Sequence, residues 1–293
     1  MVFKPFCKIY QVIIDLHCHT KFSDGELTPE EIVLRAANRN IDVLAITDHD
    51  TIDGLDSAHQ AIEKYSLKLN LIDGVEISTW WHGFEIHILG LNVNRADAQF
   101  QQRLSQQLET RENRAHRIAE KLEKFGFKDC LKEVKKIANG QCISRVHFAK
   151  YLLSLGEVNT IQKAFDKYLG RKQKAYVSPN WISIEEAVNW IKEAGGQAVL
   201  AHPSRYELNN KWIRRLVDEF SALGGDAIEV ALPRQSKNET IQLAQYANSA
   251  GLKASAGSDF HRVSPYTELG RYAPMPENVD PVWSSWQEIQ RFS

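Results

Sequence analysis

Short apolar runs alternate with amphipathic segments along most of the chain, and several of these segments begin with helix-capping residues. Thr28, Pro29 and Glu31 give the amphipathic segment 27–40 the pattern of a capped helix start. The apolar run that comes next, at 41–47, is typical of a buried strand. The same pair of helix and buried strand is repeated at 181–202, 211–230 and 238–259, and the first of these helices is also predicted to begin with a capping box, Ser183 and Glu186. The pattern therefore predicts a series of β-α units.

Three further apolar runs complete a set of about seven predicted strands. They lie at 11–17, 69–78 and 84–93. The link between the last two, TWWHG, is too short for a helix, so these two strands are predicted to form a hairpin. Repeated β-α units imply a parallel sheet, and about seven of them are typical of a barrel close to the TIM type. The segment 282–292 predicts a short helix that packs through Trp283 and Trp286.

Residues 96–176 do not follow this alternation of helices and strands. They show no convincing strand pattern and contain helical stretches such as 96–126. We therefore predict two domains, a barrel formed by 1–95 and 177–293 and a helical insertion at 96–176 that acts as a substrate lid. The insertion holds 17 Lys and Arg against 9 Asp and Glu, so its charge is +8 (17 − 9), although the whole chain carries −1. This basic block indicates either a solvated helical surface or a binding surface for a polyanionic ligand.

Composition argues against several other classes of protein. No apolar run approaches about 18 residues, and the N-terminal segment lacks the pattern of a signal peptide. Cys7, Cys18, Cys130 and Cys142 are scattered without a C-x-x-C motif, so neither a disulfide framework nor a thiolate zinc site is expected. The G-x-S-x-G, phosphate-loop and catalytic Cys-His patterns are also absent from the sequence. We expect a cytoplasmic protein with no membrane association and no obligatory protein partner.

Imidazole and carboxylate side chains gather where the predicted strands end, which is where a parallel barrel places its chemistry. They are His17, His19, Asp24, His49, Glu76, His87, His202, Asp259 and His261. Six buried histidines without partners would be a costly core, because buried polar groups need hydrogen bonds. Together with carboxylates, however, they are suitable ligands for divalent first-row metals. Nine such residues exceed the needs of one ion and suit two or three.

Six motifs in order carry a resemblance to a known family. DLHCHTKFSDG, ITDHDT, GVEIS, HILG, AHP and GSDFH resemble the motifs of the polymerase-and-histidinol-phosphatase (PHP) family of metal phosphoesterases. The resemblance implies an α/β fold, a distorted TIM-like (β/α)7 barrel, here with a helical insertion domain. The position of the insertion resembles the branch of the family that contains 3′,5′-nucleoside bisphosphate phosphatases and 5′-to-3′ exoribonucleases.

The resemblance also implies how the ligands are shared among the ions. A first ion would be held by His17, His19, Glu76 and Asp259, a second by Glu76, His87 and His202, and a third by Asp24, His49 and His261. Some branches have His where this chain has Asp24, which leaves the metal preference of the third position open. We expect Mn²⁺, with Mg²⁺, Fe²⁺ and Zn²⁺ as alternatives. A hydroxide bridging two cations would then attack the phosphate ester.

Three further residues are candidates for binding substrate. Ser144 is predicted to cap a helix that places Arg145 and His147 in its first turn, and Arg205 lies beside His202. An arginine at a helix start can bind phosphate, and the alternative is an ordinary exposed helix end. Among the acidic neighbours of the motifs, Asp15 and Asp48 would either orient ligand histidines or stabilise strand ends, and Asp50 is predicted to cap the next helix.

The predicted activity is hydrolysis of the 3′ phosphate ester of 3′,5′-bisphosphonucleotides and of 5′-phosphorylated RNA ends. The same mechanism can serve both substrates, because binding of the 5′-phosphate places the 3′ ester at the metals in either case. Three alternatives stay open at this point. They are a histidinol-phosphate or other small-molecule phosphatase, a non-catalytic PHP binding module, and a metal hydrolase of amide bonds.

Overall fold

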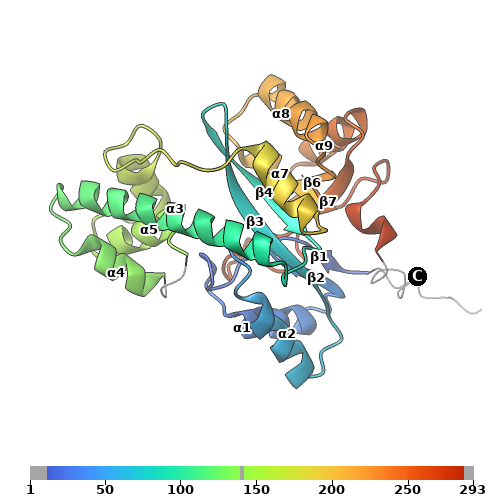
Figure 1. Ribbon diagram of the computed structural model, residues 1–293, viewed down its shortest axis with the longest axis horizontal. Helices are drawn as coiled ribbons and strands as arrows, with labels where there is room; N and C mark the ends of the chain where they lie inside the picture. The colour runs from blue at the N-terminus through green and yellow to red at the C-terminus, as the bar shows by residue number, and fades with distance from the viewer. Residues whose placement is uncertain (1–11, 139–141, 287–293) are drawn as a thin grey trace, which may run out of the picture.

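The computed structural model describes residues 12–138 and 142–286, and its centre is a seven-stranded sheet that is nearly closed into a barrel (Figure 1). The strands are adjacent in chain order: β1 (Ile14–Asp15), β2 (Val43–Ile46), β3 (Asn70–Trp81), β4 (Phe84–Leu91), β5 (Gln197–Leu200), β6 (Ala227–Ala231) and β7 (Lys253–Ala256). Backbone hydrogen bonds of 3.1 Å from Leu16 N to Ala256 O and 2.8 Å from His19 N to Phe260 O join the two outer strands. The predicted TIM-like barrel is thereby confirmed.

The direction of β4 sets it apart from the other strands. The predicted hairpin is confirmed, with Trp81 opposite Phe84 at its tip, but β4 is also antiparallel to β5. All other neighbouring strands are parallel. Because the hairpin reverses the chain, the amino-terminal half of β4 lies at the mouth where the parallel strands end. Glu85 therefore lies at the mouth together with His87.

Helices cover the outside of the sheet. α1 (Pro29–Asn38) and α2 (Leu55–Lys64) lie on one side, and α7 (Ile184–Glu193), α8 (Asn210–Ala222) and α9 (Lys237–Ser249) on another (Figure 1). Capping boxes begin three of these helices, as the sequence predicted for two of them: the caps are Thr28, Ser183 and Ser236. In each box the hydroxyl and a glutamate satisfy backbone N–H groups that the first helical turn leaves free.

The insertion forms a helical lobe beside the barrel (Figure 1). Its elements are α3 (Ala98–Glu123), α4 (Cys130–Ile137), α5 (Arg145–Ser154), α6 (Ile161–Ala164) and a π-helical turn, η1 (Phe165–Leu169). Phe100 and Leu104, near the start of α3, pack in the core of the barrel. Ile118 and Leu122, near its end, pack in a separate core with the other insertion helices. One helix thus connects the two hydrophobic cores.

Short helical turns complete the described chain. η2 (Pro203–Arg205) comes after β5, and η3 (Val282–Ser285) lies under the barrel. The buried Trp286 donates a 2.6 Å hydrogen bond from Nε1 to Gln197 Oε1. The helix predicted at 282–292 is therefore one 3₁₀ turn as far as it can be traced, since 287–293 lie outside the described residues, as do 1–11. None of the described helices is long and apolar enough to span a bilayer.

Candidate metal centre

All nine side chains predicted as metal ligands lie at the same mouth of the barrel. His17 and His19 come after β1, His49 after β2, His202 after β5, and Asp259 and His261 after β7. Asp24 comes from the loop before α1, while Glu76 and His87 stand on β3 and β4. Two of them have left-handed backbone conformations, His202 at φ +31° and Asp259 at φ +47°. Such strain in residues other than glycine is found preferentially at functional sites.

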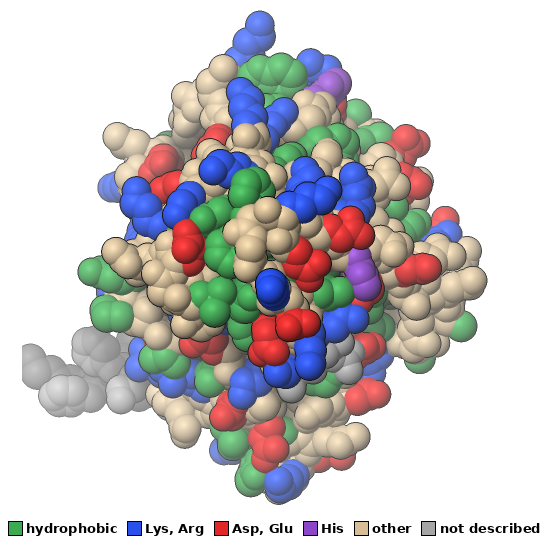
Figure 2. Space-filling model, turned by 90° about the vertical axis from the view of Figure 1, so that its left-hand side faces the viewer, with side chains coloured by type: hydrophobic (Ala, Val, Ile, Leu, Met, Phe, Trp, Pro, Cys, Tyr) green, Lys and Arg blue, Asp and Glu red, His purple; other side chains and the backbone are tan. Residues whose placement is uncertain are grey.

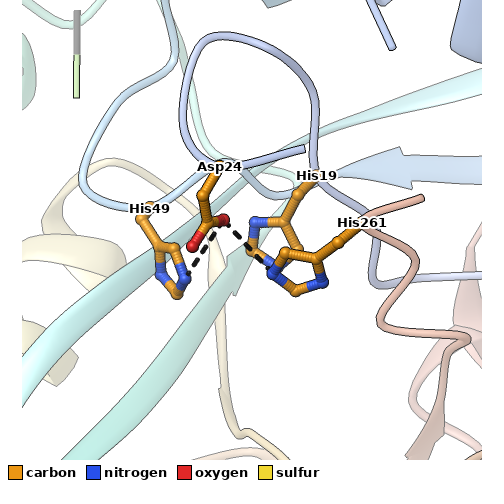
Figure 3. A group of neighbouring side chains, drawn as sticks. All are labelled: His19, Asp24, His49 and His261. Atoms are coloured by element: carbon orange, nitrogen blue, oxygen red, sulfur yellow. Dashed lines mark ion pairs between the residues drawn. The ribbon is translucent and has the colours of Figure 1, made fainter. Parts of the chain in front are cut away.

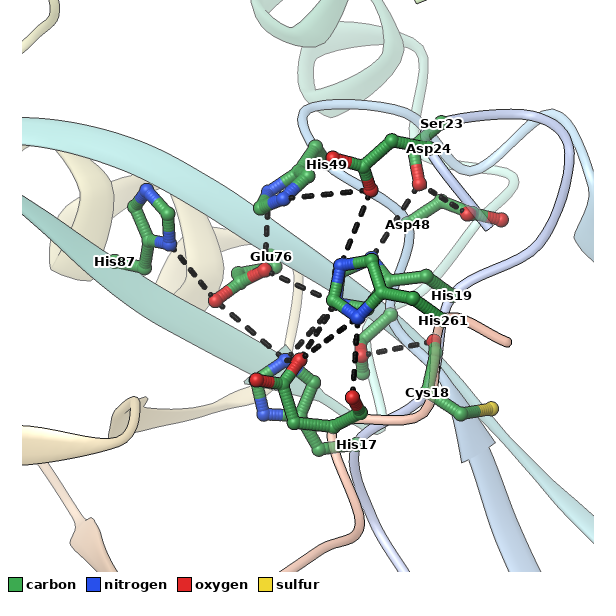
Figure 4. A network of polar contacts seen from close by, with 12 residues as sticks. His17, Cys18, His19, Ser23, Asp24, Asp48, His49, Glu76, His87 and His261 are labelled. Atoms are coloured by element: carbon green, nitrogen blue, oxygen red, sulfur yellow. Dashed lines mark hydrogen bonds and ion pairs between the residues drawn. The ribbon is translucent and has the colours of Figure 1, made fainter. Parts of the chain in front are cut away.

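Glu76 is the centre of the group. Its carboxylate lies between 2.9 and 3.5 Å from a ring nitrogen of each of five histidines: His17, His19, His49, His87 and His202. Figure 4 shows Glu76 among four of these histidines, His17, His19, His49 and His87, and Glu76 itself is 1% exposed. A single carboxylate reached from several directions is suited to bridge neighbouring cations.

A second group surrounds Asp24. Figure 3 shows its carboxylate between the rings of His49 and His261, with His19 beside them. Asp24 Oδ1 lies 3.2 Å from His261 Nε2 and 3.8 Å from His49 Nε2. One donor atom from each of the four residues falls within 4.8 Å of the others. The structure therefore brings together the three residues predicted for the third ion and adds His19 to them.

Asp259 connects the two groups. Its Oδ1 lies 3.4 Å from His17 Nε2, from His19 Nε2 and from His261 Nδ1. Its other oxygen accepts a hydrogen bond from Arg205 Nη1. Asp259 thus faces the histidines with one oxygen and a guanidinium with the other.

The arrangement of the nitrogen and oxygen atoms suits bound divalent cations better than it suits hydrogen bonds among the side chains themselves. His49 Nδ1 and Glu76 Oε2 lie 3.0 Å apart, yet neither these atoms nor Asp24 Oδ1 has a hydrogen-bond partner, although all three are buried. Buried polar atoms in native proteins are nearly always satisfied, so converging free lone pairs point to a missing partner. A mixed set of imidazole and carboxylate donors is what divalent first-row metals accept.

The carboxylates of the centre are held in their ionised form, which is the form that binds metal. Burial alone would raise the pKa of Glu76, but His49, His87 and His17 hold it well below its usual range. The same balance lowers the pKa of Asp24, through His261 and His49, and of Asp259, through His17 and His261.

A buried glutamate that the sequence analysis missed supports two of the predicted ligands. Glu229, on β6, is 0% exposed. Its Oε1 lies 3.0 Å from His17 Nδ1, and its Oε2 accepts a 2.7 Å hydrogen bond from the backbone N–H of His202. A proton on Nδ1 leaves His17 Nε2 free to face the other ligands. A lone carboxylate inside the apolar run 227–232 was the signal that could have revealed it.

We expect Glu229→Gln to weaken metal binding by roughly ten- to a hundredfold, because an amide cannot accept from both His17 and His202 and carries no charge. A competition titration of Mn²⁺ against a chromophoric chelator measures this. Asp226→Asn is the matched control, since Asp226 lies just before the same strand and binds Lys192 and the N–H of Ala198. Unchanged metal affinity in the Gln variant would show that Glu229 has only a structural role.

The two acidic neighbours of the motifs differ in role. Asp48 accepts 2.6 Å and 2.5 Å hydrogen bonds from the hydroxyls of Thr20 and Ser23, and the Ser23 hydroxyl lies 3.4 Å from His19 Nδ1. Asp15 accepts from backbone N–H groups, with bonds of 2.8 Å from Ser258 and 2.7 Å from Gly270. Asp48 therefore reaches a candidate ligand through a serine, whereas Asp15 ties β1 to the loop after β7.

The insertion forms the roof of a cavity of about 280 Å³ over the candidate ligands. Arg145, at the start of α5, lines this roof and donates a 2.8 Å hydrogen bond to Glu85 Oε2. Arg114 and Trp181 also contact Glu85, whose Oε1 lies 3.4 Å from Arg114 Nη1 and 2.9 Å from Trp181 Nε1. Arg205 lines the same cavity and contacts Asp259, one of the candidate ligands.

One roof arginine has a free donor. Arg114 is 8% exposed, and its Nη2 has no hydrogen-bond partner. Burial lowers the pKa of Arg114 to about 10, so the guanidinium remains charged at neutral pH. A buried cation with an unused N–H group beside a cavity is suited to receive an anion.

His147 lies apart from this cavity. It is 3% exposed, and its Nδ1 accepts a 3.0 Å hydrogen bond from the backbone N–H of Ser144. Burial lowers its pKa to about 4, so the ring is neutral. Ser144 caps α5 as predicted and also donates a 3.1 Å hydrogen bond to Asp24 Oδ2. Of the three predicted substrate-binding residues, the structure therefore brings Arg145 and Arg205 to the cavity and leaves His147 outside it.

Asp50 does not cap a helix, contrary to the sequence prediction. It is buried, and its Oδ2 accepts a 2.6 Å hydrogen bond from Arg111 Nε on α3, while Arg111 Nη2 donates to Ser78 Oγ at 2.6 Å. Asp50 and Ser78 come just after His49 and Glu76 on the same segments. The reason is long-range: the insertion supplies a cation that Asp50 can bind, and α2 begins later, at Leu55. This contact fixes α3 to segments that carry candidate ligands.

The basic character of the insertion is not concentrated in one outer patch. Figure 2, which views the insertion side, shows Lys and Arg side chains mixed with acidic and hydrophobic ones. Ion pairs such as Lys135–Glu112 and Lys167–Glu157 account for part of this mixture. The arginines that face the cavity are therefore the better candidates for contact with a polyanion.

A nearly closed α/β barrel with clustered imidazoles and carboxylates at its mouth is typical of hydrolases that work with divalent metals. The chain belongs to the PHP domain family, whose pattern matches residues 15–199. The family resemblance of the six sequence motifs is thereby confirmed.

Relatives of similar length narrow the class of reaction. A 5'-3' exoribonuclease Rnm of Salmonella typhimurium is 47% identical over 281 residues, which is 96% of each chain. A 3',5'-nucleoside bisphosphate phosphatase of Chromobacterium violaceum is 39% identical over 279 residues, covering 94% of this chain and 96% of that protein. This protein is accordingly a hydrolase of phosphoester bonds.

Solved structures agree with the fold. One, described as an amidohydrolase from Chromobacterium violaceum with bound sulfate, has a TM-score of 0.86 and 38% identity over 96% of this chain and 97% of its own. Another, described as a metal-dependent phosphoesterase from Bifidobacterium adolescentis, has a TM-score of 0.76 and 28% identity over 95% and 94% of the two chains. Both superpose over almost the whole length, insertion included.

Proposed function

We propose that this protein hydrolyses the 3′ phosphate ester of 3′,5′-bisphosphonucleotides and of 5′-phosphorylated RNA ends, acting on RNA as a 5′-to-3′ exonuclease. The observation that carries the proposal is that one cavity is lined both by the candidate metal ligands and by Arg114 and Arg145 of the insertion. The names of the relatives from Salmonella and Chromobacterium support the two substrates.

The nine side chains at the mouth would hold two or three divalent cations, with Mn²⁺ as the metal we expect from their mixed donors. When bound, the cations would activate water at neutral pH and neutralise charge on the phosphoryl oxygens. Glu76 would bridge neighbouring positions, because its two oxygens face ligands from several strands. Glu229 and Ser23 keep His17 and His19 oriented toward the centre.

The insertion positions the substrate. Arg145 and the free Nη2 of Arg114 would bind the 5′-phosphate at the roof, and Glu85 keeps the two guanidinium groups side by side. Arg205, which contacts Asp259, would bind the phosphate that is cleaved. If the roof binds one phosphate and the mouth binds the other, a mononucleotide and an RNA end can use the same site. The buried roof also limits the access of water.

A substrate panel tests the proposal. The metal-loaded protein would be given 3′,5′-bisphosphoadenosine, a 5′-phosphorylated oligoribonucleotide and histidinol phosphate, and its metal content would then be analysed. We expect the first two to be hydrolysed at the 3′ ester. Histidinol phosphate should be a poor substrate, because it has no second phosphate for the roof to bind. Preference for histidinol phosphate would favour a small-molecule phosphatase, and no turnover of any member would favour a non-catalytic module.

We expect Arg145→Ala to raise KM for 5′-phosphorylated substrates by roughly ten- to a hundredfold, because the variant loses one charge-assisted hydrogen bond to the 5′-phosphate. Activity on p-nitrophenyl phosphate, which has no 5′-phosphate, should change little. Lys150→Ala is the matched control, because Lys150 is a cation on the same helix that pairs with Glu26 outside the cavity. Equal loss on both substrates would instead assign Arg145 to the fold or the metal centre.

A further inference from the structure

The loop after β7 starts at the metal centre and ends in an exposed aromatic side chain. Asp259 and His261 lie at its beginning, among the candidate ligands. A few residues later Tyr266 is 63% exposed and Val263 is 52% exposed, and Tyr266 is the most exposed large hydrophobic side chain of the described residues. Two exposed apolar side chains therefore stand on a loop that begins among the candidate ligands.

The exposed position of Tyr266 is fixed by its own loop. The Ser264 hydroxyl accepts from the backbone N–H groups of Tyr266 and Thr267, at 3.2 and 3.0 Å. The guanidinium of Arg271 donates a 3.2 Å hydrogen bond to the carbonyl of Pro265. The ring therefore projects from a hydrogen-bonded turn.

A cation from the neighbouring loop lies over this ring. Arg234, in the loop after β6, has its guanidinium carbon 4.5 Å from the centre of the Tyr266 ring. Arg234 is exposed and has a left-handed backbone, with φ +60°, which is unusual for a residue with a side chain. A hydrogen bond of 3.1 Å from Ala273 N to Leu232 O ties the loop after β6 to the segment that comes after Tyr266. The two loops thus present one surface.

The charge of this surface is positive. Arg234 and Arg262 are both exposed, whereas the two carboxylates of residues 257–270, Asp259 and Glu268, already face cations. Asp259 faces Arg205 and the histidines, and Glu268 forms an ion pair of 2.6 Å with Arg35 on α1. Flat π faces and guanidinium groups together are what single-stranded nucleic acid binds, by stacking and by attraction of phosphates.

We propose that Arg234, Arg262, Val263 and Tyr266 form a binding surface for the nucleotides on the 3′ side of the cleaved bond in single-stranded RNA. The inference rests on the proposed function for its direction. If the 5′-phosphate is at the roof and the first 3′ ester is at the metals, the second nucleotide leaves from the metal centre away from the roof. Arg205, Asp259 and His261 line the cavity, and the loop that begins with Asp259 and His261 leads to Tyr266. The base of a downstream nucleotide stacks on the Tyr266–Arg234 pair.

The experiment compares two substrates that differ only in the number of nucleotides on the 3′ side of the cleaved bond. In 3′,5′-bisphosphoadenosine there is none, and in a 5′-phosphorylated hexaribonucleotide there are five. We expect Tyr266→Ala to lower kcat/KM for the hexanucleotide roughly tenfold, the effect of losing one stacked base, and to change the mononucleotide rate less than about twofold. Arg234→Gly, which tolerates the left-handed backbone, should act in the same direction and reduce the salt dependence for the hexanucleotide.

Tyr65→Ala is the matched control. Tyr65 is also exposed, at 42%, with Lys64 over its ring at 4.6 Å, but it lies at the end of α2 away from the loops after β6 and β7. This variant should leave both substrates unchanged. Equal losses on the two substrates in Tyr266→Ala, or no loss on either, would overturn the proposal, as would a change from dimer to monomer in sedimentation, which would make the surface a contact between copies.

A binding measurement separates this proposal from the proposed function. The probe is a fluorescent 5′-phosphorylated hexanucleotide whose first 3′ linkage is a non-hydrolysable methylenephosphonate, added to the metal-loaded protein. Weaker binding by Tyr266→Ala, with Tyr65→Ala unaffected, supports the surface even if the wild type failed to cleave RNA. Unaltered binding refutes the surface even if cleavage of both substrates were demonstrated.

Discussion

Glu76→Gln is expected to lower kcat/KM by about a thousandfold or more on every phosphoester substrate, because stabilisation by the metals is worth several kcal/mol. The side chain keeps its shape but loses the charge that faces five imidazoles. Steady-state kinetics with excess Mn²⁺, together with the metal content of the purified variant, measure the effect.

The matched control is Glu63→Gln, the same change at an exposed position of α2. It should leave both the rate and the metal content unaltered. A Glu76→Gln protein that keeps a normal metal content and turns over at the wild-type rate would rule out Glu76 as a bridging ligand. Loss of the folded state, monitored by circular dichroism, would be distinguished from loss of chemistry by repeating the measurement with Glu76→Asp.

Removal of metal by a chelator is the second change with a large expected effect. We expect activity to fall by about a thousandfold or more and to return on addition of Mn²⁺, more fully than with Mg²⁺, because imidazole donors suit manganese better than magnesium. Dialysis against chelator, elemental analysis and titration with each metal ion provide the test. Full turnover by protein shown to contain no metal would exclude a metal mechanism altogether.

The same experiment reports on the stability of the folded protein. Buried lone pairs of Asp24, His49 and Glu76 face one another without partners, so a bound cation would stabilise the native state. The melting temperature should therefore rise with metal concentration. Glu229→Gln should shift this dependence to higher concentrations of metal.

The sequence predicted which side chains gather at the mouth of the barrel, because their signals are local. His17 and His19 are two residues apart at the end of an apolar run, so they face the same side of an extended chain. His49 and His202 likewise stand directly after apolar runs that form buried strands. The helix caps at Thr28 and Ser183 could be predicted for the same reason, because the hydroxyl and a glutamate three residues later bond free backbone N–H groups at the helix start.

The residues that the sequence did not reveal act through partners far along the chain. Glu229 contacts His17 across 212 positions, and Arg111 contacts Asp50 across 61. A buried glutamate in an apolar strand has no local partner that would disclose its role. Asp50 resembled a helix cap for the same reason, because the cation that binds it, Arg111, comes from α3 in the insertion.

By itself, then, the sequence predicted the order of helices and strands, the barrel, the hairpin, the family and the imidazole and carboxylate side chains that meet at the mouth. Burial periodicity and capping arise from interactions within one or two turns or along one strand. Only the tertiary structure decided that β4 runs against β5 and brings Glu85 to the mouth, that α3 connects two cores, and that His147 lies outside the cavity that Arg145 lines. These features depend on which distant surfaces exclude water from one another and which buried charges become paired, and that free energy is defined only when the whole chain is folded.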